Sequence, residues 1–113
     1  MTWFSALLFF ECEVIGAAES DPLCEKSVRI FRAAGEEEAM TKAEEIGRRA
    51  ETEYPNVDGQ TVVWRFVRVL EVQDLTEEEL GEGMEVFSRL MWKSEIQAER
   101  WLRSEDEFGG STG

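Results

Sequence analysis

The chain has no histidine and only two cysteines, and its 113 residues show none of the common catalytic signatures. Histidine is the usual general base near neutral pH, and a catalytic cysteine normally needs such a base. The GxSxG, P-loop and GxGxxG patterns are all absent. Two paired carboxylates could still provide acid–base catalysis, as they do in glycosidases, but a chain this small leaves little room for a cleft that binds a sugar. We therefore expect a protein that is not an enzyme.

The same scarcity restricts metal and redox chemistry. A Cys/His zinc site is excluded without histidine, and Cys12 and Cys24 cannot supply four thiolates within one chain. Two cysteines do not make a disulfide framework, which favours free thiols in a reducing cytoplasm. Cys12 falls on the apolar side of an alternating segment, as a buried core thiol does. We expect no cofactor and no metal.

Basic residues are also scarce, since 12 Lys and Arg stand against 25 Asp and Glu, for a net charge of −13. This charge argues against binding to nucleic-acid phosphates or to an anionic membrane surface. No apolar stretch is long enough to cross a bilayer. The apolar start at 1–10 lacks the positive region of a signal peptide, because the first basic residue is Lys26. We expect a cytoplasmic protein.

Alternating apolar residues predict four strands, at 2–15, 27–33, 61–73 and 84–92. The strand at 61–73 is apolar on both sides, which is typical of a central strand. One of its faces is expected to carry Val62, Trp64, Phe66, Arg68, Leu70 and Val72.

One long helix is predicted at 36–54. Three glutamates open it, where carboxylates interact favourably with the helix dipole. Its apolar stripe is Ala39, Ala43, Ile46 and Ala50, and Pro55 stops it. The capping-box pattern at 76–79 predicts a short helical turn, and a last helix is expected at 94–103 with Trp101 and Leu102 on its apolar side.

The order β-β-α-β-β-α, without a repeat or linker, indicates one α+β domain at 1–104 and a disordered polar tail at 105–113. The expected architecture is a two-layer sandwich, in which a mainly antiparallel four-stranded sheet is covered on one face by the long helix. The other face also carries large apolar residues. We expect the C-terminal helix or a second subunit to cover it.

Five segments of the chain resemble a small bacterial domain-of-unknown-function family, number 4288. They are 3–11, 37–39, 42–47, 63–72 and 83–89, with the sequences WFSALLFFE, EEA, KAEEIG, VWRFVRVLEV and GMEVFSR. The resemblance covers residues 3 to 92, and the helix after Trp92 looks like an extension. These are strand and helix patterns, so the resemblance implies a fold and no particular activity.

Acidic residues concentrate between positions 71 and 85, where no Lys or Arg occurs. This acidic segment contains Glu71, Asp74, Glu77, Glu78, Glu79, Glu82 and Glu85. It is open to three interpretations: a docking surface for a basic partner, a site for a hard cation with oxygen ligands, and a solvated loop. The spacing of the carboxylates does not match an EF-hand.

Arg68 is the basic residue that stands out, because it lies between Phe66 and Leu70 on an apparently buried face. A buried arginine must be paired, and Glu11, Glu13 or Glu85 are candidate partners. The alternative is an anion site formed by Arg68 and Arg89, with Trp64 nearby. Trp64 is otherwise an anchor of the core or of an interface.

These observations predict a non-enzymatic protein-interaction module, a homodimer that binds a basic protein and serves as an immunity-type or accessory protein. The alternatives are a small-ligand or anion-binding regulatory domain and an acidic nucleic-acid mimic. Dimerisation is expected through the sheet face away from the helix or through a strand edge. The candidate binding residues are Trp64, Arg68, Arg89, Glu77, Glu78, Glu79 and Glu82.

Overall fold

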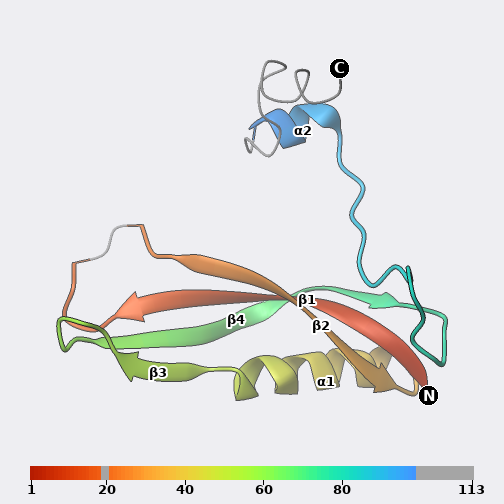
Figure 1. Cartoon of the computed structure of the whole chain (residues 1–113), viewed down its shortest axis with the longest axis horizontal. Coiled ribbons are helices and arrows are strands. Elements are labelled where there is room, and N and C mark those ends of the chain that lie inside the picture. The colour runs from red at the N-terminus through yellow and green to blue at the C-terminus, as the bar shows by residue number, and fades with distance from the viewer. Residues whose placement is uncertain (19–20, 99–113) are drawn as a thin grey trace.

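The computed structural model describes residues 1–18 and 21–98. Its elements are β1 (Thr2–Val14), β2 (Cys24–Ala33), α1 (Glu36–Arg49), β3 (Thr52–Pro55), β4 (Thr61–Asp74) and α2 (Lys93–Ala98). The strands form one antiparallel sheet in the order β2-β1-β4-β3, and α1 lies along one face of it (Figure 1). The expected α+β class with a four-stranded antiparallel sheet is confirmed.

The expected helix at 36–54 is wrong in length, because α1 ends at Arg49 after 14 residues. The chain then turns onto the edge of β4, where the Glu51 carboxylate accepts the backbone N–H of Phe66 at 2.9 Å. The next four residues form β3 and pair with the start of β4. Pairing with β4 satisfies backbone groups at a sheet edge, so it prevails over continued helix here.

The fourth strand is therefore β3, and the expectation of a strand at 84–92 is wrong. Side chains hold this segment instead: Gln73 Nε2 donates to the Ser88 carbonyl at 2.6 Å, and Arg89 lies 3.8 Å from the Glu71 carboxylate. Within the described residues no backbone pairing joins it to the sheet. Alternation of apolar and polar residues is therefore not sufficient to make this segment a strand of the sheet.

The expected helical turn at 76–79 is absent as well. Thr76 has a φ of +58°, which is outside the right-handed helical region. Its backbone N–H bonds to Oδ1 of Asp74 at 2.6 Å, which is the hydrogen bond of an Asx turn. This local hydrogen bond from side chain to backbone stabilises a turn in place of the first turn of a helix.

The core lies between α1 and the sheet face that it covers, which we call the helix face. Small residues of α1 allow the helix to approach the large side chains of the sheet closely. The buried cluster contains Phe4, Ala6, Leu8, Phe10, Phe31, Ala33, Ala39 and Ala43, and Ile46, Ala50, Trp64, Phe66, Val69 and Val72 pack against it. Cys12 is buried, as expected, and Cys24 is exposed; both are free.

Two register shifts interrupt the pairing of β1 with β4. Phe9 lies opposite Arg68, whereas Phe10 lies opposite Phe66. Opposed side chains share a face, so Arg68 and Phe66 lie on different faces of the sheet. The expectation that they share one face is wrong, because each bulge inserts a residue into β4 and reverses the alternation. The inserted residues are Val67 and Leu70.

The opposite face of the sheet, which we call the open face, carries Trp3, Ser5, Leu7 and Phe9 of β1 and Val28 and Ile30 of β2. Its two parts differ in burial. Ser5 and Leu7 of β1 are buried, and they lie opposite Gln73 and Glu71 of β4, whose side chains bind the segment that follows β4. Val28 and Ile30 of β2, in contrast, are 42% and 40% exposed.

The C-terminal helix does not cover the open face as far as it is described. No residue of α2 contacts another helix or strand, and Figure 1 shows α2 standing away from the sheet. Trp101, Leu102 and the expected tail at 105–113 lie outside the described residues. None of the helices described is long and apolar enough to span a bilayer.

Candidate functional site

The acidic segment comprises the end of β4, up to Asp74, and a loop at 75–85, which we call the acidic loop and which the start of β1 ties down. The Trp3 carbonyl accepts the N–H of Leu75 at 2.9 Å, and the Trp3 N–H donates to the Glu77 carbonyl at 3.0 Å. These bonds continue the β1–β4 pairing by a few residues beyond the end of β4. The loop backbone is therefore fixed at this end of the sheet, although it contains no regular element.

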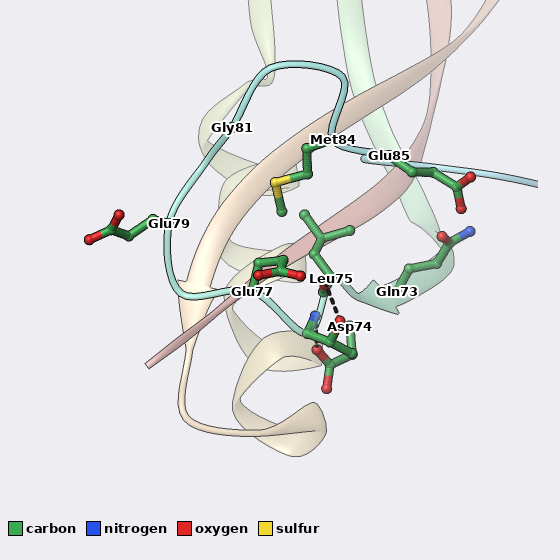
Figure 2. A pocket seen from close by; sticks show the side chains of 9 residues that line it. Gln73, Asp74, Leu75, Glu77, Glu79, Gly81, Met84 and Glu85 are labelled. Carbon is green, nitrogen blue, oxygen red and sulfur yellow. Dashed lines mark hydrogen bonds between the residues drawn. The ribbon is translucent and has the colours of Figure 1, made fainter.

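The loop encloses a hollow of about 460 Å³. Figure 2 shows the side chains of Leu75 and Met84 pointing toward one another across it, while Glu79 points away. The hollow thus combines two apolar side chains with carboxylates and other polar groups. Its lining residues are Gln73, Asp74, Leu75, Thr76, Glu77, Glu79, Gly81, Met84 and Glu85.

Most carboxylates of the acidic segment have no cation partner among the residues that the structure describes. Within the described part of the chain, Glu71 pairs with Arg89, but none of the other six carboxylates forms an ion pair. Five of these six side chains, Glu77, Glu78, Glu79, Glu82 and Glu85, are exposed and make no hydrogen bond there. Their negative field is therefore directed outward, at one end of the sheet.

These carboxylates do not converge on a metal ion. Among residues 1–18 and 21–98 no group of three or more Asp, Glu, Cys or His side chains is arranged to hold one. The carboxylates of the loop are spread around a hollow that is also lined by Leu75 and Met84, which differs from the compact oxygen cage that Ca²⁺ needs.

The expected pairing of Arg68 is wrong. Arg68 is exposed and has no hydrogen bond or ion pair with any residue that the structure describes. Of its expected partners, Glu13 pairs instead with Arg65, 2.9 Å from its Nη2. The bulges in β4 are the reason, since they place Arg68 on the open face, where water solvates its charge.

Trp64 lies on the helix face, so the fold does not bring it together with Arg68. Its Nε1 donates to the Tyr54 hydroxyl at 3.1 Å. Arg89, the third member of the expected anion site, is held by Glu71. The combination of Trp64, Arg68 and Arg89 therefore forms no common pocket in the described structure.

A different arginine lines a hollow together with Trp64. Beyond the end of α1 the helix face has a hollow of about 220 Å³, lined by Phe10, Glu25, Arg29, Ala50, Thr52, Tyr54 and Trp64. The sequence indicates one member of this set of lining residues, because its alternation places Arg29 on the same side of β2 as Phe31. It does not indicate Tyr54, because this residue was expected to lie in the helix.

Comparison with known proteins gives one result. The model of a protein family described as Domain of unknown function (DUF4288) matches residues 3–88, which confirms the resemblance read from the sequence. No curated protein and no solved structure matches the chain.

Proposed function

The chain belongs to the family Domain of unknown function (DUF4288), and we propose that it is a non-enzymatic interaction module that binds a basic protein through its acidic loop. One observation carries the proposal. The exposed carboxylates of the loop have no cation among the described residues, and Glu77, Glu79 and Glu85 among them border a hollow that is also lined by Leu75 and Met84. A protein surface with unbalanced charge attracts a partner of opposite sign.

The chemistry of the hollow favours lysine and arginine side chains. Their alkyl stems pack on apolar surface while their charged heads stay at a polar border. Leu75 and Met84 offer the apolar part, and Glu77, Glu79 and Glu85 supply the carboxylates. An immunity-type or accessory protein that neutralises a cationic partner is the concrete form of this proposal.

The compact placement of the carboxylates favours docking over nucleic-acid mimicry. A mimic needs negative charges in rows over a broad face, at the spacing of phosphates. In this chain the acidic loop occupies one end of the sheet, and the open face carries the basic side chains of Lys26, Arg32, Arg65 and Arg68.

Two free cysteines support a cytoplasmic location.

A labelled arginine-rich peptide and fluorescence anisotropy test the docking site. We expect the double variant Glu77→Gln/Glu79→Gln to weaken binding about tenfold, because two close carboxylates are lost. The matched control is Glu45→Gln/Glu53→Gln, which removes two exposed, unpaired carboxylates elsewhere. Equal losses in the two variants would show that net charge alone attracts the peptide, and the loop would not be the site.

We also propose that the protein is a homodimer that buries the exposed part of the open face. Val28 and Ile30 of the edge strand β2 are exposed beside their partners Leu7 and Ser5 of β1, and α2 does not cover them. Apolar patches of this kind mark interaction sites when they are continuous. The second copy would also cover β2, whose outer edge is unpaired in the described sheet.

A further inference from the structure

The hollow beyond the end of α1 lies on the helix face, at the end of the sheet opposite to the acidic loop. It exists because α1 is short: the helix ends at Arg49, whereas β1 continues to Val14. Phe10 forms its buried base, only 3% exposed. The loop and this hollow are separate, since the loop is tied to Trp3 at the start of β1 and the hollow is built on Phe10.

Two aromatic rings form a wall of this hollow and are joined by a hydrogen bond. Trp64 Nε1 of β4 donates to the Tyr54 hydroxyl of β3 at 3.1 Å, which favours one orientation of the two side chains relative to each other. The hollow is open to solvent and has a volume of about 220 Å³, which leaves room for one aromatic ring with a small polar group. It therefore offers a single ring an aromatic wall to pack against.

Arg29 adds a cation to this aromatic site. It is half-buried, and its Nε donates to Ser27 Oγ at 2.9 Å, which directs the side chain along β2. It forms no ion pair with any described residue, in a protein with 25 acidic side chains. A guanidinium held in this way, with its terminal N–H groups available, matches the two oxygens of a carboxylate.

Glu25 stands on the same side of β2 and lines the same hollow, but it does not pair with Arg29. The two opposite charges thus both border the hollow without forming an ion pair with each other. An α-amino acid carries a negative carboxylate and a positive ammonium group. If it is bound between Arg29 and Glu25, its carboxylate can pair with Arg29 and its ammonium group with Glu25.

From these contacts we infer that the hollow binds an aromatic α-amino acid. The ring enters between Phe10, Tyr54 and Trp64, the carboxylate binds Arg29, and the ammonium group binds Glu25. A peptide that ends in an aromatic residue shares the ring and the carboxylate, but its last residue has no free ammonium group. Glu25 therefore favours the free amino acid over the peptide end.

The test is a titration of the full chain with L-phenylalanine, followed through the indole N–H resonance of Trp64 in ¹⁵N NMR spectra and assigned with Trp64→Phe. We expect saturable shifts with a Kd on the order of 1 mM for so small a ligand. Phenethylamine, which lacks the carboxylate, should bind about tenfold more weakly, and N-acetyl-L-phenylalanine about fivefold more weakly.

Arg29→Gln should weaken phenylalanine binding about tenfold. The matched control is Arg68→Gln, which removes the same charge from an exposed, unpaired arginine on the open face and should leave binding unchanged. A dispersed amide spectrum confirms that each variant is folded. The proposal is overturned if the Trp64 resonance does not respond to phenylalanine, if phenethylamine binds equally well, or if Arg29→Gln binds as the unaltered protein does. Equal binding of the acetylated compound would exclude the free amino acid as the preferred ligand.

Discussion

Gly47 of α1 lies directly against the ring of Phe66 in β4, and a Cβ atom at Gly47 would overlap three carbon atoms of that ring. The contact explains a glycine in the last turn of a helix, where alanine is the better helix former. It also sets how closely α1 approaches the centre of the sheet. Phe66 also packs against Phe10, at 5.8 Å between ring centroids.

Gly47→Ala should therefore destabilise the protein. Alanine improves helix propensity by about 1 kcal/mol, but overpacking against a ring that has little room to move costs about 1–3 kcal/mol. Urea denaturation measures the net loss in the free energy of unfolding. Gly81→Ala is the control, because a Cβ atom there meets nothing within 4 Å. A more stable Gly47→Ala protein would mean that Phe66 moves aside.

Arg68→Ala should change the free energy of unfolding by less than about 0.5 kcal/mol, since an exposed side chain without a partner contributes little. Leu8→Ala, on the helix face of β1, should cost about 2–5 kcal/mol, because Leu8 is fully buried. The same denaturation experiment compares the two. A large loss in the free energy of unfolding from Arg68→Ala would contradict the exposed position of Arg68 and favour the buried ion pair that we expected from the sequence.

Size-exclusion chromatography with light scattering should give twice the 13.0 kDa mass of one chain. The net charge of −13 opposes association, so the dimer should tighten as salt rises toward about 0.15 M. Ile30→Lys should dissociate it by placing a charge in the buried patch. Val57→Lys, at a fully exposed turn residue, is the control. A monomeric mass at every micromolar concentration and salt would exclude the dimer.

Thr76→Gly should leave the protein equally stable or stabilise it by up to about 1 kcal/mol. A β-branched residue at a φ of +58° is strained, and glycine removes this strain while it loses more chain entropy on folding. Thermal unfolding measures the difference. Gly83→Thr, at a φ of +77°, is the reciprocal change and should destabilise. A clear loss from Thr76→Gly would show that the threonine hydroxyl bond to Leu75 outweighs the strain.

Local patterns determined much of the fold. Period-two alternation located β1, β2 and β4, the spacing of Ala39, Ala43 and Ile46 located α1, and Cys12 was correctly placed in the core. These features follow from which side of an element faces apolar surroundings, and the sequence records that directly. The acidic character of the loop after β4 and the resemblance to DUF4288 were likewise readable.

The tertiary structure decided what depends on pairing between distant segments. The alternation at 84–92 resembles a strand as much as that of β2, but β3 occupies the place beside the start of β4. The two bulges in β4 have no local signature, and they alone moved Arg68 to the open face. That Trp64 and Arg29 line one hollow requires that β1 lie between β2 and β4. Strand order and register are set by non-local hydrogen bonds, so periodicity along one segment determines its faces but not its neighbours.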